Sequence, residues 1–251
     1  MAEGDRDDAE TPVSEGRHAD PARSVQAAFG SALCTKFEIY SYRNAAGLLA
    51  QAFPGHFAEL RDALERFTIT RQMIRRPGGS RGPIAQYVDE LLPDDWVEAR
   101  ISADLRVRLH DAKKREVILK EYWREGYLDG HRIDYLKGRV ALDVEWNSKD
   151  QTYDRDLYAF SAFHQAGAID LGVILTRGSS LDGAFFRSLG PVLTKDGKDG
   201  TEMVFRKFGA STTWMGKLLY RLDAGRNAGC PVLAIGITPR CIAPAELSAL
   251  N

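Results

Sequence analysis

Two short and almost wholly apolar segments constrain the fold most strongly. They are LGVILTR at residues 171–177 and CPVLAIGIT at residues 230–238. Such runs are typical of strands that are covered on both faces. Segments of helical character lie between them and beside them, at residues 154–167, 180–189 and 209–225. Strands that alternate with helices predict an α/β fold, a central mixed β-sheet flanked by helices on both faces.

The N-terminal half is expected to be mainly helical up to about residue 92. Residues 44–67 carry apolar side chains at helical spacing, and residues 84–92 continue this pattern until a proline ends it. Between them, residues 71–83 contain Pro and Gly that break a helix, together with four arginines. This segment is predicted to be a solvated loop or, alternatively, an arm that contacts phosphate groups.

The charge distribution separates an acidic N-terminus from the remainder. Residues 1–25 contain seven acids, three arginines and almost no large apolar side chain, which predicts a disordered acidic tail before a single domain at residues 26–251. The chain carries a net charge of −1 and the tail carries −4, so the remainder carries about +3. This balance excludes a strongly basic protein such as a histone, but it still allows a basic cleft that binds nucleic acid.

The sequence also indicates where the protein resides. No apolar run approaches the roughly 20 residues of a membrane helix, and the acidic N-terminus lacks the apolar core of a secretory signal. The cysteines Cys34, Cys230 and Cys241 are odd in number and widely spaced. They suit a reduced cytoplasm and do not have the close pairing of a zinc site.

Candidate chemistry lies on a predicted hairpin. HRIDYLKG at residues 131–138 and RVALDVEWN at residues 139–147 predict two strands joined by a turn at Lys137 and Gly138. Side chains alternate along a strand, so the second strand has a core face of Val140, Leu142, Val144 and Trp146, opposite a face of Ala141, Asp143, Glu145 and Asn147. Asp134 on the neighbouring strand can reach Asp143 and Glu145.

Carboxylates that converge on a sheet repel one another unless a cation neutralises them. Oxygen ligands favour Mg²⁺ or Mn²⁺ over zinc, and the chemistry such a site typically serves is phosphodiester hydrolysis. The alternative is that these acids are solvent-facing charges on an amphipathic strand. The pattern of an Asp, eight intervening residues and then Asp-x-Glu is short enough to arise by chance.

The segment HRIDYLKGRVALDVEWNSKDQTYDRDL resembles the catalytic core of the PD-(D/E)xK nucleases. More narrowly, it resembles the type II restriction endonucleases grouped around BglII and BstYI. GGSRGPIAQYVDELLPDDWVEARI, AFHQAGAIDLGVILTR and GASTTWMGKLLYRLDAGRNAGCPVLAIGITP resemble the flanking segments of that group, in the same order. The resemblance covers roughly residues 70–240 and implies a restriction-endonuclease-like core.

Residue by residue, the resemblance implies that Asp134 takes the place of the Asp of the PD half and Asp143 the (D/E) place. Both, with Glu145, are the expected metal ligands. The sequence departs from the PD-(D/E)xK pattern in two places. Ile133 replaces the usual proline, and Glu145 occupies the place usually held by lysine. Relatives that resemble BamHI hold Glu at this third place, and BglII-like ones hold Gln.

The sequence leaves more than one candidate for the third catalytic position. A second register, in which Asn147 takes the third place after Glu145, is an alternative. Lys149 is a candidate for the missing positive charge, or else a solvated residue at a strand end. The nuclease fold often places a further Glu on a preceding helix, and residues 117–126 offer Glu121 and Glu125, with no basis for choosing between them.

DNA contacts are expected from the C-terminal segment. Ser211, Thr212 and Thr213 are small hydroxyl residues at a predicted helix start, where they either contact DNA or cap the helix. Lys217 and Arg221 lie four residues apart on that helix and form one basic stripe. Arg177, at the end of an apolar strand, is a further candidate.

The resemblance implies a Mg²⁺-dependent homodimer that cuts double-stranded DNA at a short palindrome, with a cognate DNA methyltransferase encoded nearby. Two symmetric sites explain how a two-fold dimer cuts both strands. One alternative is a non-specific or repair nuclease of the same fold. The other is a DNA-binding module that has lost the chemistry, which retention of all three carboxylates argues against.

Overall fold

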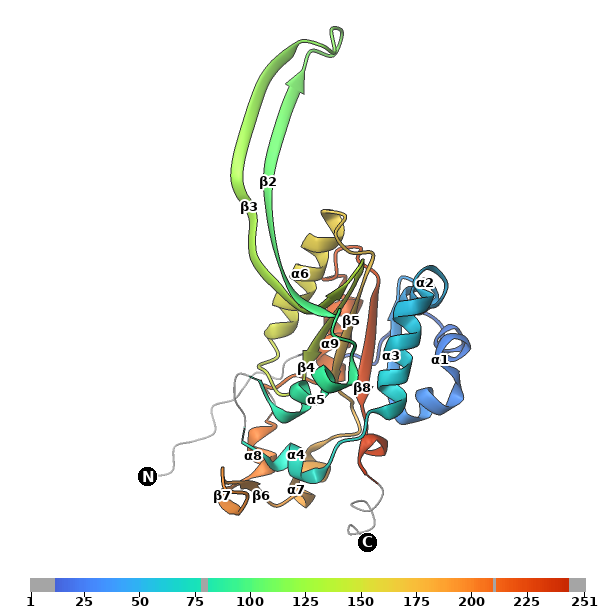
Figure 1. The fold of residues 1–251 in the computed structure, drawn as a ribbon, viewed down its shortest axis with the longest axis vertical. Helices are drawn as coiled ribbons and strands as arrows, with labels where there is room; N and C mark the ends of the chain where they lie inside the picture. Colours follow the sequence, from blue (N-terminus) through green and yellow to red (C-terminus); the bar gives the residue numbers. More distant parts are fainter. Residues whose placement is uncertain (1–11, 78–80, 210, 244–251) are drawn as a thin grey trace.

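The computed structural model describes residues 12–77, 81–209 and 211–243 and is built around a six-stranded sheet (Figure 1). In spatial order the strands are β1 (Phe37–Tyr42), β8 (Val232–Ile237), β5 (Leu171–Arg177), β4 (Val140–Glu145), β3 (Ile118–Lys137) and β2 (Val97–His110). The three central strands β8, β5 and β4 run parallel, and the outer pairings are antiparallel. The sheet is therefore mixed, as predicted.

Helices cover both faces of this sheet, which confirms the predicted α/β class. One core cluster joins the sheet to α1 (Ala22–Lys36), α2 (Ala45–Ala52), α3 (Pro54–Arg66), α4 (Arg71–Arg75) and α5 (Pro83–Leu91). A second cluster joins the opposite face to α6 (Thr152–Gln165) and α9 (Met215–Asp223). The remaining elements are α7 (Gly183–Ser188), β6 (Pro191–Leu193), β7 (Asp199–Met203), α8 (Val204–Lys207) and a 3-10 turn (Pro239–Cys241).

Strand β4 divides its side chains between the two clusters. Val140, Leu142 and Val144 belong to the first cluster, whereas Ala141 belongs to the second. This alternation confirms the predicted core face and directs Asp143 and Glu145 towards the face that α6 covers. The β3–β4 turn is displaced by one residue from the prediction, because Lys137 already pairs with Val140 and Gly138, at φ +52°, begins the turn.

Two predicted helices differ in the structure. The helix expected over residues 44–67 is divided into α2 and α3 at Pro54, because proline has no N–H to continue α2 but is well suited to begin α3. The helix expected over residues 117–126 is wrong, since residues 118–126 belong to β3. Glu121 forms ion pairs with arginines of β2, and Glu125 is exposed on the same ribbon, so neither lines the carboxylate site.

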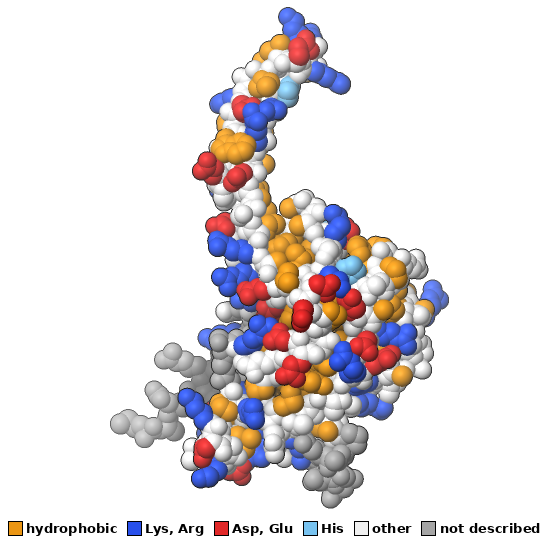
Figure 2. Space-filling model, viewed as in Figure 1, with side chains coloured by type: hydrophobic (Ala, Val, Ile, Leu, Met, Phe, Trp, Pro, Cys, Tyr) orange, Lys and Arg blue, Asp and Glu red, His pale blue; other side chains and the backbone are white. Residues whose placement is uncertain are grey.

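The outer parts of β2 and β3 form a two-stranded ribbon that projects from the body (Figure 1). Basic, acidic and hydrophobic side chains are distributed along it (Figure 2). Leu119, Tyr122 and Trp123 are among its exposed hydrophobic side chains, and Trp123 is 58% exposed. A two-stranded ribbon has no core of its own and is only marginally stable in water without a further layer.

The described part of the predicted tail lies against the body. The backbone N–H of Ser14 donates to the carbonyl of Gly216, and the Asp20 carboxylate accepts from Ser41 Oγ at 2.6 Å. Helix α1 begins at Ala22, before the predicted domain boundary at residue 25. Residues 12–25 thus contribute contacts to the fold, and the predicted disorder of residues 1–11 lies outside the described residues.

Asp223, at the end of α9, anchors this segment. Its carboxylate accepts hydrogen bonds from Ser14 Oγ, from the backbone N–H groups of Arg17 and His18, and from Tyr42 Oη. Partial burial alone would raise the pKa of Asp223, but these four donors outweigh it and hold the pKa below its ordinary value.

Substitution of Asp223 with alanine is expected to lower the free energy of unfolding by roughly 1–3 kcal/mol, because its donors lose a shared acceptor. Urea denaturation measures this effect, with the exposed Asp94→Asn as the control. An unchanged midpoint in Asp223→Ala would show that the contacts of Asp223 with residues 14–18 add nothing to stability.

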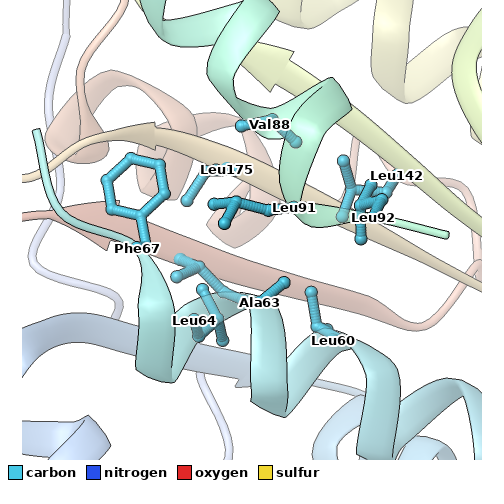
Figure 3. A pocket seen from close by; sticks show the side chains of 10 residues that line it. Leu60, Ala63, Leu64, Phe67, Val88, Leu91, Leu92, Leu142 and Leu175 are labelled. Carbon is cyan, nitrogen blue, oxygen red and sulfur yellow. The ribbon is translucent and has the colours of Figure 1, made fainter.

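An apolar gap lies between α3, α5 and the sheet (Figure 3). Its lining is formed by Leu60, Ala63, Leu64, Phe67, Val88, Leu91, Leu92, Leu142, Leu175 and Ile235. These side chains offer no polar atom for chemistry. Separately, none of the helices in the described ranges combines the length and apolar character that crossing a membrane requires.

Candidate active site

The predicted carboxylates line a large cleft on the α6 side of the sheet. The charged and amide side chains in its lining are Arg81, Glu98, Arg132, Asp134, Asp143, Glu145, Asn147, Arg155, Asp156 and Lys207. They come from the segment before α5, from strands β2, β3 and β4, from the loop after β4, and from α6 and α8. The cleft therefore combines a compact acidic centre with basic side chains.

Strand pairing brings Asp134 and Asp143 together. Tyr135 pairs with Leu142 in the antiparallel β3–β4 ladder, so Asp134 and Asp143 face each other one step further along. The backbone N–H of Asp134 donates to Asp143 Oδ1 at 2.7 Å, and the backbone N–H of Val144 donates to Asp134 Oδ2 at 3.1 Å. The proximity predicted from the sequence is present in the structure.

Asp143 and Glu145 are buried, with exposed fractions of 4% and 5%. Burial, followed by repulsion from Asp156 and Asp134, raises the pKa of Asp143 well above its ordinary value. Burial and the charge of Asp156 likewise raise the pKa of Glu145. Asp143 Oδ2 and Glu145 Oε2 are buried oxygen atoms without a hydrogen-bond partner, which is a costly arrangement unless another group approaches them.

Two further site residues were missed by the sequence argument. Asp156, in the first part of α6, is 2% exposed and interacts with Glu145. Arg155 bonds Asp156 Oδ1 at 2.9 Å and lies 3.5 Å from Glu145 Oε1. Asp154 pairs instead with Arg221 and Arg226, whereas Asp156 lines the cleft.

The acidic centre offers the type of ligand atom that a hard divalent cation prefers. Its ligand atoms are all oxygens, and unpartnered oxygens of Asp143, Glu145 and Asp156 lie at the same site. No group of three or more acidic, histidine or cysteine side chains in the described ranges is arranged as ligands around one point. One oxygen each of Asp134 and Asp143 already accepts a backbone N–H.

Asn147 and Lys149 differ in their relation to the cleft. Asn147 is part of the lining, and its Oδ1 is buried without a hydrogen-bond partner. Lys149 is exposed and lies outside the lining, while its backbone forms a bridge with Thr212. Asn147 can therefore take part in the site directly, whereas Lys149 is poorly placed to supply the missing positive charge.

The predicted basic stripe on α9 is internal. Lys217 and Arg221 are 3% and 4% exposed, and both pair with Asp150, at 3.2 and 3.8 Å. Arg221 also contacts Asp154 at 3.0 Å. These ion pairs hold α9 against the start of α6, and they leave both cations poorly placed to meet DNA.

The other predicted DNA contacts lie around residues 211–213. Arg177 is buried above the Phe186 and Phe208 rings and donates to Thr212 Oγ1 at 3.1 Å. Thr213 is buried and Ser211 is exposed. The alternative of side-chain capping is not observed, because α9 begins later than expected, at Met215, and has no side-chain cap.

A mixed sheet with an acidic cleft beside two adjacent strands is the arrangement of a restriction-endonuclease-like nuclease. The model of the family Restriction endonuclease BglII/BglIII matches residues 37–237, and the chain belongs to this family. It is accordingly a type II restriction endonuclease, a site-specific deoxyribonuclease that binds double-stranded DNA. Enzymes of this kind generally use a divalent metal ion. A search of curated proteins found no match.

Proposed function

We propose that the protein hydrolyses both strands of DNA at a short palindrome and requires Mg²⁺. The observation that carries this proposal is the pair of buried carboxylates, Asp143 and Glu145, whose unpartnered oxygens line the cleft beside Asp134. A buried acidic pair is unfavourable for folding in the absence of a cation. Its position in a cleft with basic walls suits binding of both a metal ion and a phosphate group.

Asp134, Asp143 and Glu145 would hold the ion, and Mn²⁺ would substitute because it prefers the same oxygen ligands. When bound, the ion lowers the pKa of water and offsets negative charge on the phosphate. The backbone N–H groups of Asp134 and Val144 fix the two aspartates in place. Asn147 is proposed to orient water or phosphate beside them.

Digestion of a plasmid of known sequence tests this proposal. A sequence-specific enzyme produces discrete fragments with Mg²⁺ or Mn²⁺ and none with EDTA. A smear would favour a non-specific or repair nuclease of the same fold. Absence of cleavage with either ion would indicate a DNA-binding module without activity.

The proposed symmetric cleavage requires two copies of the chain. Exposed hydrophobic side chains on the β2–β3 ribbon are consistent with association, because such a ribbon gains stability when another surface covers it. Light scattering is expected to give about twice the 27.9 kDa chain mass. A monomer that still makes double-strand breaks in single encounters would contradict the symmetric arrangement.

We further propose that the enzyme acts in the cytoplasm, where Cys34, Cys230 and Cys241 remain free thiols. Host DNA then requires protection by a cognate methyltransferase encoded nearby.

Among the predicted DNA contacts, exposed Ser211 is the one best placed to meet a phosphate group. Ser211→Ala is not expected to alter the sequence that is cut, because phosphate contacts position the protein without reading bases.

A further inference from the structure

The acidic centre lacks the lysine that nucleases of this superfamily usually contribute, and the structure shows which cation lies there instead. Four arginine and lysine side chains line the cleft, namely Arg81, Arg132, Arg155 and Lys207. Three of them bind partners other than the acidic centre. Arg81 pairs with Asp89 and Tyr135, and Arg132 pairs with Glu98. Lys207 donates to the backbone carbonyl of Arg76. Arg155 is the member of this set that bonds the acidic centre itself.

We propose that Arg155 is a catalytic residue that contacts the scissile phosphate; this assignment rests on the proposed nuclease function. Its Nε and Nη2 atoms bond Asp156 Oδ1 at 3.1 and 2.9 Å, which fixes the guanidinium in the cleft. The Asp156 that anchors it is almost completely buried, whereas the Arg155 side chain is 66% exposed. Within the described residues Nη1 forms no hydrogen bond, so it is available to a phosphate oxygen.

The chemistry defines what an arginine contributes at this position. In hydrolysis the water oxygen bonds to phosphorus and one P–O ester bond breaks. One water proton passes to the leaving oxygen and the other is released to solvent. The guanidinium remains protonated throughout, so Arg155 does not act as the general base. It stabilises the negative charge that builds up on the phosphate oxygens in the transition state.

The local fold explains why Arg155 takes this place in preference to Lys149. Strand β4 ends at Glu145, and α6 begins at Thr152 and packs back across the same face of the sheet. The first part of α6 therefore lies over the acidic end of β4. Lys149 belongs to the connection between these elements and points to solvent outside the cleft lining.

The test compares three Arg155 variants in the plasmid assay with Mg²⁺. Arg155→Ala and Arg155→Gln are expected to lower kcat by about 10²–10³-fold, since each removes a charge aimed at the transition state. Arg155→Gln retains an amide donor for Asp156 and guards against a loss of folding. Arg155→Lys restores the charge, and its kcat is expected to be about tenfold higher than that of Arg155→Gln. Arg61→Ala, an exposed arginine of α3, should cut like wild type.

A second readout does not depend on cleavage. Binding is measured with Ca²⁺ on a duplex that contains the site mapped from wild-type digests. Loss of one phosphate contact is expected to reduce the slope of log affinity against log salt by about 0.9 in Arg155→Gln. A merely structural role for Arg155 would leave this slope unchanged.

Several outcomes would overturn the assignment. Wild-type kcat in Arg155→Ala or Arg155→Gln, while Asp143→Ala is inactive, would overturn it and leave the proposed function intact. Inactive Lys149→Ala beside active Arg155→Ala would transfer the role to Lys149. A wild-type protein that cuts no DNA with Mg²⁺ or Mn²⁺ would overturn the proposed function and this assignment together.

Discussion

Substitution of Asp143 with asparagine is expected to lower the rate of plasmid cleavage by at least about three orders of magnitude. Such a loss corresponds to roughly 4 kcal/mol of transition-state stabilisation, a plausible contribution from a direct metal ligand. The change keeps the shape of the side chain and removes its charge, so the fold should persist. A time course of supercoiled plasmid with Mg²⁺ measures the rate.

DNA binding by Asp143→Asn should survive and is expected to tighten, because a negative charge facing the phosphate is gone. A gel-shift titration in EDTA, where no ion offsets the charge of Asp143 and no cleavage is expected, measures the affinity. Asn147→Ala, just beyond the end of β4 in the same cleft, is the matched variant and should cut with a smaller loss. Efficient cutting by Asp143→Asn beside an inactive Asn147→Ala would shift the third catalytic position to Asn147.

The same substitution is expected to stabilise the metal-free protein. Burial and neighbouring acids raise the folded-state pKa of Asp143, so the carboxylate form is less favourable in the folded state than in the unfolded chain. We therefore expect Asp143→Asn to have a higher free energy of unfolding than wild type at pH 8. Urea denaturation in EDTA measures this difference.

The pH dependence follows from the raised pKa. Below the unfolded-state pKa of about 3.9 both states hold the proton, so wild type and variant should differ little there. As the pH rises above this value, wild type loses stability relative to Asp143→Asn until the folded-state carboxyl also ionises. Asp94→Asn, at an exposed position, should change stability by less than about 0.5 kcal/mol. A destabilised Asp143→Asn would contradict this account of the site.

The parts of the site that lie on strands could be predicted from the sequence. Period-two alternation is a local property of the chain, so it was enough to place Asp143 and Glu145 on one face and Asp134 beside them. The apolar segments that became β5 and β8 were equally clear, because a strand buried on both faces needs no polar side chain.

Features that depend on packing between elements were not accessible in this way. Asp156 and Arg155 reach the site because of how α6 lies across β4, and no local pattern determines that placement. Lys217 looked like a surface cation, since its partner Asp150 is far away in the sequence. The ribbon was mistaken for a helix at residues 117–126 because its pairing with β2 outweighs the helix preference of Lys and Glu.

Sequencing of the DNA ends from a Mg²⁺ digest tests the central claim most directly. Site-specific cleavage by two symmetric copies predicts one short sequence at every end, self-complementary about its centre, with both strands cut at equivalent positions. It also predicts that Asp143→Asn yields none of these ends under the same conditions. Ends of unrelated sequence, or the same ends from Asp143→Asn, would contradict the account.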